Sequence, residues 1–183
     1  KVVYKTRLPG VGTQVLTIKL ARRAPKTIVT LSESGPENHK SDPVESGVDS
    51  GWQMALSVLK NYVENHFGKN RETFFAMLPA QFEFPTLRHL FTTEEGWNKW
   101  LNLQSPPPEK AGDLYSVKFD SGATASGKVL ALTHHEISMA WDEIDGYWEI
   151  KSFPTGGDNK GLCMRGGTYS GDKPKTEDIE AQI

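Results

Sequence analysis

The hydrophobic and polar positions from Ser50 to Phe67 follow the period of a helix. Apolar residues recur there at three- and four-residue spacing and form one stripe, with polar residues on the other side. The stripe consists of Trp52, Ala55, Leu56, Leu59 and Val63. Ser50 is predicted to cap the N-terminus, and Gly68 to end the helix in a left-handed conformation. An amphipathic helix of this kind needs a partner surface.

Three segments before this helix alternate as strands do. Residues 1–8, 13–22 and 26–35 mix β-branched and charged residues at period two, which predicts an antiparallel meander. Residues 35–49 are polar and rich in turn formers, so they are predicted to be a linker.

The pattern after Gly68 predicts a strand, short helices and more strands. The first strand is expected to end at Pro79. One or two short helices follow, with Pro85 in the first turn and a second start at residues 93–95. Five strand-like segments come next, at residues 113–119, 126–133, 136–144, 147–153 and 161–170. Asp145-Gly146 is a strong hairpin signal, and residues 175–183 begin like a helix.

Composition indicates a globular chain of one or two domains. The 183 residues are 37% hydrophobic and 24% charged and include five tryptophans. No run approaches the eighteen apolar residues of a membrane span, so no membrane partner is expected. Cys163 is the only cysteine and cannot form an intrachain disulfide, which favours a cytoplasmic location.

Charge argues against nucleic-acid binding. Residues 1–69 carry a net charge of +4 and the remainder −6, but the basic residues form only a modest cluster around Arg22 and Arg23. Lysines and arginines at strand ends usually protect sheet edges.

Candidate chemistry is sparse. His134-His135-Glu136 lacks a third suitable ligand because neighbouring residues of an extended segment point to opposite sides. Asp142, Glu143 and Asp145 are interpreted as solvated turn charges, and Cys163 as a packed residue without a neighbouring base. Arg165 could meet an acidic ligand, although an arginine at a sheet edge needs none. The sequence therefore assigns no catalytic residue, metal site or cofactor.

Two parts of the chain resemble one family. LPGVGTQVLTIKL, IVTLSESG and SGWQMALSVLKNYVE resemble the C-terminal half of the Hsp ninety ATPase activator homologue-like domain, within the START-related helix-grip (SRPBCC) superfamily. LRHLFTTEEGWNKWL and SGKVLALTHHEISMAWDEI resemble the N-terminal portion of a second such domain.

The resemblance implies an α+β helix-grip fold, in which a curved antiparallel sheet wraps around a long C-terminal helix. Residues 1–69 would be the C-terminal part of a first unit, and residues 70–183 a second unit with a truncated C-terminal helix. The chain would then be a fragment of a tandem two-domain protein. A single rearranged domain is the alternative.

The resemblance also implies an apolar cavity. Strand alternation places Ile137, Met139 and Trp141 on one face, and Trp148 and Ile150 on one face of the next strand. With Trp97 and Trp100 they are predicted to line a ligand cavity, although ordinary core packing explains them too.

The predicted function is binding of a small apolar or lipid-like molecule, without assigned catalysis. The family also contains chaperone-ATPase stimulators and polyketide cyclases. The alternatives are therefore a co-chaperone-like domain in the stress response, with a protein partner, and a cyclase- or hydrolase-type enzyme that uses the cavity.

Overall fold

The computed structural model divides the chain into two compact units, Lys1–Ser46 and Gly47–Ile183. It describes residues 1–8, 12–35, 48–133, 136–156 and 159–170. The long helix belongs to the second unit, whereas the sequence predicts a division after residue 69. The assignment of the two halves to two family domains stays a prediction.

The first unit is an antiparallel meander of three strands. Its strands are β1 (Val2–Leu8), β2 (Gly12–Arg23) and β3 (Lys26–Ser34), paired in the order β1-β2-β3. The three strands predicted from the alternation of residues 1–35 are therefore confirmed.

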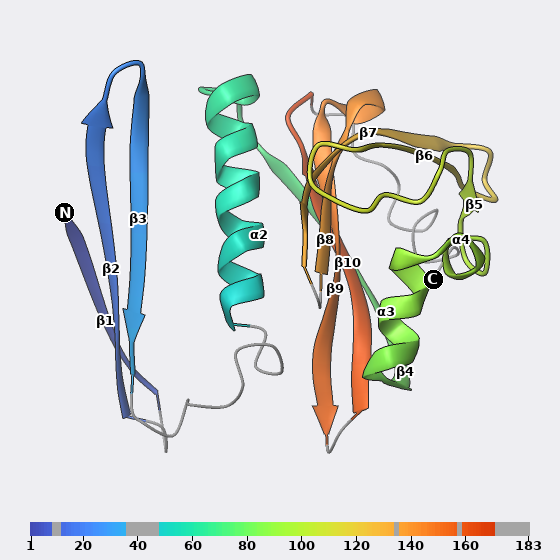
Figure 1. Cartoon of the computed structure of the whole chain (residues 1–183), viewed down its shortest axis with the longest axis horizontal. Helices are drawn as coiled ribbons and strands as arrows, with labels where there is room; N and C mark the ends of the chain where they lie inside the picture. The colour runs from blue at the N-terminus through green and yellow to red at the C-terminus, as the bar shows by residue number, and fades with distance from the viewer. Residues whose placement is uncertain (9–11, 36–47, 134–135, 157–158, 171–183) are drawn as a thin grey trace. The chain divides into compact units, whose positions relative to one another are not determined.

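The second unit is built on a seven-stranded antiparallel sheet (Figure 1). Its strands are β4 (Glu72–Glu83), β5 (Asn102–Leu103), β6 (Leu114–Lys118), β7 (Thr124–Leu132), β8 (Glu136–Trp141), β9 (Gly146–Gly156) and β10 (Asn159–Thr168). They pair in the order β4-β10-β9-β8-β7-β6-β5, so β4 lies beside the last strand. Two short helices, α3 (Phe84–Thr92) and α4 (Glu94–Trp97), carry the chain from β4 at one edge to β5 at the other. The predicted α+β class is confirmed.

Local sequence signals explain two of the junctions. Thr93 caps α4, because its hydroxyl accepts a hydrogen bond from the Gly96 amide at 3.0 Å. The predicted hairpin at Asp145-Gly146 joins β8 to β9. A short 3₁₀ turn, Asp142–Ile144, precedes Asp145, which adopts the left-handed conformation with φ of 48°.

Pro79 does not end a strand. β4 continues to Glu83, and its pairing with β10 shifts register between Lys160 and Leu162, opposite the segment that contains Pro79. Because β4 is an edge strand, a missing amide donor at an irregular point is tolerated there.

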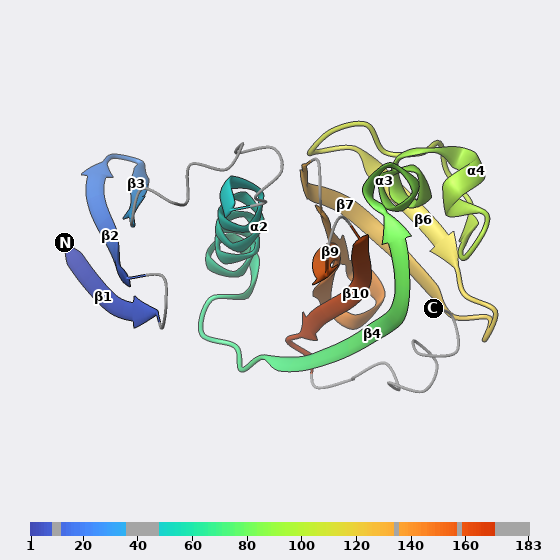
Figure 2. The same ribbon diagram turned by 90° about the horizontal axis from the view of Figure 1, so that it is seen from below.

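The two faces of the sheet carry different elements, as Figure 2 shows. Helices α3 and α4 contribute Phe91 and Trp97 to a large apolar cluster on one face. The long helix α2 (Val48–Asn61) contacts β7 and β8 from the opposite face. There the hydroxyl groups of Ser57 and Ser138 lie 3.4 Å apart.

The predicted long helix is present, but its start and its buried face differ from the prediction. It begins at Val48, so Ser50 lies inside the first turn and is not the N-cap. Gly68 has a φ of 86° and ends the helix as predicted.

The buried face of α2 is rotated from the predicted stripe. Met54 and Val58 are buried, whereas Leu59 and Val63 of the predicted stripe are 45% and 52% exposed.

Some predictions fall outside the described residues. These are the pair His134-His135, the helix expected at 175–183, most of the linker at 35–49 and the wrapping of the sheet around a C-terminal helix.

Candidate functional site

A pocket of about 670 Å³ lies between the C-terminal half of the long helix and the strands β7 and β8, entirely within the second unit. We name it the α2–β8 pocket. Its polar and charged lining consists of Ser57, Lys60, Asn61, Glu64, Asn65, His66, Lys128, Asp142 and Asp145. Its apolar lining consists of Ala111, Leu114, Val129, Leu130 and Ala140, with glycines 112, 127 and 146. The pocket is therefore mixed in character, and its size lies within the range of small-molecule sites.

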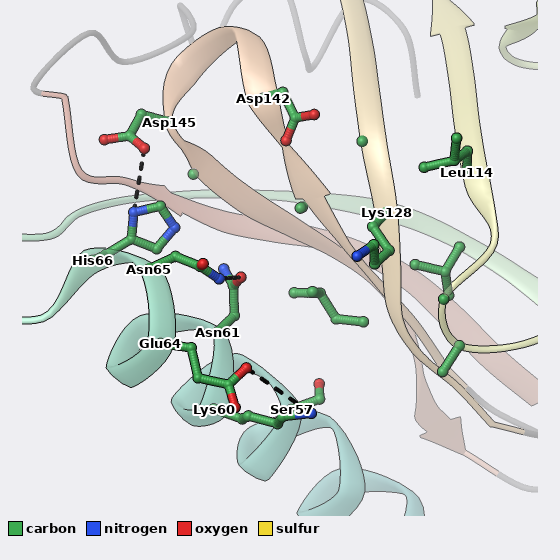
Figure 3. A pocket seen from close by; sticks show the side chains of 17 residues that line it. Ser57, Lys60, Asn61, Glu64, Asn65, His66, Leu114, Lys128, Asp142 and Asp145 are labelled. Atoms are coloured by element: carbon green, nitrogen blue, oxygen red, sulfur yellow. Dashed lines mark hydrogen bonds and ion pairs between the residues drawn. The ribbon is translucent and has the colours of Figure 1, made fainter.

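A wide helical turn supplies one wall. After Asn61 the chain forms a π-helix, η2 (Tyr62–His66), which contains Asn65 and His66. Short π-helical turns often occur at functional sites. Figure 3 shows Asn61, Asn65 and His66 pointing from the helix toward the strands. Polar side chains are thus directed at the sheet, where an ordinary amphipathic helix would place apolar ones.

Asn61 is buried, being 7% exposed. Its side-chain oxygen accepts a hydrogen bond from Asn65 Nδ2 at 2.9 Å. Its own Nδ2 has no hydrogen-bond partner among the described residues. Leaving a buried donor unpaired costs about 1–3 kcal/mol, so this amide is suited to receive an acceptor from a bound molecule.

His66 and Asp145 form the second polar group of the pocket. The Nδ1 atom of His66 lies 3.2 Å from Asp145 Oδ1, but their relative orientation is not that of a hydrogen bond. Lys69 Nζ lies 2.5 Å from the other oxygen of Asp145. The ring of Tyr169 stacks on the imidazole with centroids 4.2 Å apart.

Burial lowers the pKa of His66, and this effect outweighs the opposing influence of Asp145; the charge of Lys69 lowers the pKa further. A histidine with a lowered pKa is neutral at neutral pH and can accept a proton. The arrangement of His66 with Asp145 can therefore support acid–base chemistry.

The seven residues predicted to line an apolar cavity lie together in the large cluster on the other face. Six of them are at most 3% exposed, and Trp100 is partly buried. The set comprises Trp97, Trp100, Ile137, Met139, Trp141, Trp148 and Ile150. None of them lines the α2–β8 pocket. Whether they hold a ligand stays a prediction.

Asp142 and Glu143 are exposed at the turn, as the sequence predicts, but the acidic side chains also have partners in the protein. Glu143 accepts hydrogen bonds from the amide of Ser126 at 2.9 Å and from its hydroxyl at 2.7 Å. Asp145 forms the ion pairs described above, and Asp142 lines the pocket. The acidic side chains find these partners because β7 and η2 lie beside the turn.

The remaining sequence candidates have ordinary surroundings. Cys163 is buried as expected of a packed residue, and burial raises the pKa of its thiol. Glu136 is buried and pairs with Lys151 Nζ at 2.6 Å. Within the described residues, no group of three or more His, Cys, Asp and Glu side chains is placed to hold a metal ion. No helix in the described part of the chain has the length and apolar character needed to cross a membrane.

The sequence did not reveal the pocket residues. The helical period of residues 50–67 puts Asn61 on the polar side of the helix, and His66 and Asp145 are 79 positions apart in the chain. The Asp145-Gly146 hairpin signal was the one local indication in the sequence. It predicts a turn there, and in the structure the left-handed Asp145 of this turn lies beside His66 of η2.

Comparison with known proteins yields distant structural likenesses. Neither a protein-family model nor a curated protein matches the chain. Protein MLL2253 from Mesorhizobium loti is 18% identical over 60% of this chain and 84% of its own, with a TM-score of 0.43. Two di-domain ARO/CYC proteins extend over more of the chain. StfQ from the steffimycin biosynthetic pathway is 12% identical over 94% of this chain and 64% of its own, with a TM-score of 0.40.

BexL, the second of these proteins, comes from the BE-7585A biosynthetic pathway. It is 13% identical over 96% of this chain and 67% of its own, with a TM-score of 0.41. Likenesses at these TM-scores carry no functional assignment. The α+β class of this chain rests on its own strand order and helices.

Proposed function

We propose that the protein binds a small amphipathic molecule in the α2–β8 pocket. The observation that carries this proposal is the side chain of Asn61, which is buried at the pocket wall with an unpartnered Nδ2. A ligand oxygen that accepts from this donor would remove the cost of leaving it unpaired.

The rest of the lining defines the class of ligand. Leu114, Leu130 and Ala140 offer apolar surface, while Lys128 and Asp142 offer charges of opposite sign. A molecule with an apolar body would match the apolar lining, and a carbonyl or ether oxygen on it would accept a hydrogen bond from Asn61. This proposal keeps the small-molecule function expected from sequence and assigns it to the opposite face of the sheet.

Native mass spectrometry tests the proposal directly. The full chain is incubated with a small-molecule extract of its source cells and desalted by size exclusion. We expect a retained mass that is lost in Asn61→Leu and kept in Asn70→Leu, which replaces an exposed asparagine outside the pocket. Circular dichroism verifies that each variant folds. An unmodified mass for the parent protein, or equal retention by both variants, would contradict the proposal.

Acid–base catalysis is a second candidate, favoured by the His66 and Asp145 pair. Asp145 lies behind the Nδ1 side of the imidazole, and burial keeps the ring neutral. This arrangement suits a general base, as a cyclase or hydrolase would need. In that case the retained molecule would be converted over time by the parent protein, whereas His66→Gln would bind it unchanged.

The apolar cavity predicted from sequence remains a further proposal for the ligand site. One polar atom supports it, because Trp97 Nε1 is buried and none of the described residues forms a hydrogen bond with it. A ligand among the seven residues around Trp97 would need an acceptor for this indole.

We also propose a family and a cellular location for the chain. The order of strand, two short helices and strands in residues 72–168 supports a helix-grip protein related to the Hsp ninety activator homologue-like family. Cytoplasmic location rests on the single cysteine.

A further inference from the structure

A second pocket, of about 390 Å³, lies on the other side of α2, over the strands β4, β9 and β10. We name it the β4–β10 pocket. It is lined by Ala55, Val58, Arg71, Thr73, Phe74, Phe75, Tyr147, Glu149, Arg165 and Gly166. It shares no lining residue with the α2–β8 pocket.

Glu149 gives this pocket an acceptor. The side chain is on β9, and the residue is 3% exposed. One carboxylate oxygen, Oε2, accepts from Arg165 Nε at 2.5 Å. The other oxygen, Oε1, is buried and has no hydrogen-bond partner in the part of the chain that the structure describes. A buried charged group with an unsatisfied oxygen is costly, so a donor from a bound molecule would stabilise it.

Arg71 gives the pocket a donor. Its Nη1 atom donates to the hydroxyl of Tyr147 at 3.1 Å. No carboxylate of the described residues forms an ion pair with it. A Cβ atom at Gly167 would lie 3.0 Å from Arg71 Cγ and Cδ, so the glycine leaves room for the arginine stem to cross β10. Arg71 also lies close enough to Tyr169 to influence its hydroxyl. Because a guanidinium has five N–H donors, it can bind a carboxylate while it contacts these tyrosines.

The sheet register fixes how these groups lie. Phe75, Arg165 and Glu149 are paired across β4, β10 and β9 in one row. Thr73, Gly167 and Tyr147 form the row two residues along, and Arg71 reaches Tyr147. Rows two residues apart are separated by roughly 7 Å. Glu149 and the contact of Arg71 with Tyr147 therefore belong to neighbouring rows and line one pocket, where a small molecule with both a donor and an acceptor can meet them.

We propose that the β4–β10 pocket binds a free α-amino acid with an apolar side chain. Its ammonium group donates to Glu149 Oε1, and its carboxylate accepts from Arg71. Its side chain lies against Phe75, which is 51% exposed, and against Tyr147. This site is independent of the proposed function of the α2–β8 pocket.

Three related probes test the two polar contacts separately. L-phenylalanine, 3-phenylpropanoate and phenethylamine are titrated into the full chain, and binding is followed by ligand-observed NMR. We expect L-phenylalanine to bind at least tenfold more tightly than either probe that lacks one charged group. Equal affinities, or no binding of L-phenylalanine, would overturn the proposal.

Variants then assign each contact. Arg71→Gln should abolish the preference for L-phenylalanine over phenethylamine, and Glu149→Gln the preference over 3-phenylpropanoate. Arg88→Gln, which replaces an exposed arginine of α3, should change neither preference. If Glu149→Gln does not fold, the comparison of probes on the parent protein still decides the outcome. Asn61→Leu should leave L-phenylalanine binding intact, which separates this site from the α2–β8 pocket.

Discussion

At the scale of single residues, Tyr115 links β6 to two other strands through hydrogen bonds inside the core. Its hydroxyl donates to the carbonyl of Ala140 at 2.6 Å and accepts from Trp148 Nε1 at 2.7 Å. Burial raises the pKa of this hydroxyl, so it stays protonated and can donate.

Replacing Tyr115 by phenylalanine removes both hydrogen bonds and leaves the indole of Trp148 unpaired. We expect the free energy of unfolding to fall by about 1–3 kcal/mol. Urea denaturation of Tyr115→Phe measures the loss, with Tyr4→Phe at an exposed position of β1 as the control. Equal midpoints for the two variants would show that the Tyr115 network does not stabilise the sheet.

His66 gives stability a dependence on pH. Burial lowers its pKa below the ordinary value of 6.5, so the unfolded chain binds a proton more readily than the folded protein does. The associated stability is present above pH 6.5 and is lost as the pH falls toward the lowered pKa of the folded state.

We therefore expect acidification from pH 7.5 to pH 5 to destabilise the parent protein more than His66→Gln. Urea denaturation at a series of pH values provides the comparison, and the other histidines are common to both proteins. A parent curve parallel to that of the variant would contradict the lowered pKa.

These residues also show what sequence could not predict. Period-two alternation correctly put Met139 and Trp148 on one face, because each lies in a regular strand. The contact of His66 with Asp145 depends on a helix end meeting a hairpin, and alternation within one segment contains no information about that.

At the scale of elements, α2 shows the limit of a helical stripe. The helix carries two apolar rows, and the sequence alone favoured the row with Leu59 and Val63. The sheet instead buries the row with Met54 and Val58. Ser57 and Asn61 lie beside that row, where Ser57 approaches β8 and Asn61 lines the pocket.

A pair of substitutions tests which row is buried. Met54 is fully buried, so Met54→Ala should cost about 2–5 kcal/mol of unfolding free energy. Leu59 is 45% exposed, and Leu59→Ala should cost clearly less. Thermal or urea unfolding measures both, and a larger loss for Leu59→Ala would mean that the predicted stripe is the packed one.

At the scale of the whole molecule, the order of elements was largely predictable. Strong turn signals and regular periods located the strands and the short helices. The boundary between the compact units was not predictable from the sequence. The helix α2 packs against β7 and β8, which lie more than sixty residues further along the chain.

Two truncations test the division into units. The piece 47–183 retains α2 and should unfold cooperatively. The piece 70–183 loses the side chains that cover Tyr147 and Tyr169, so its unfolding midpoint should be lower by more than about 10 °C. Calorimetry of the two pieces measures this difference. Equal midpoints would favour the division after residue 69.

In the proposed complex, a ligand contacts Asn61 in the α2–β8 pocket. The most direct measurement is a ¹H–¹⁵N NMR spectrum of the labelled full chain before and after addition of the small-molecule extract. We predict that the side-chain amide signals of Asn61 and Asn65 shift while the indole signals of Trp97 and Trp148 stay in place. Movement of the indole signals without the Asn61 amide, or no movement at all, would contradict the claim.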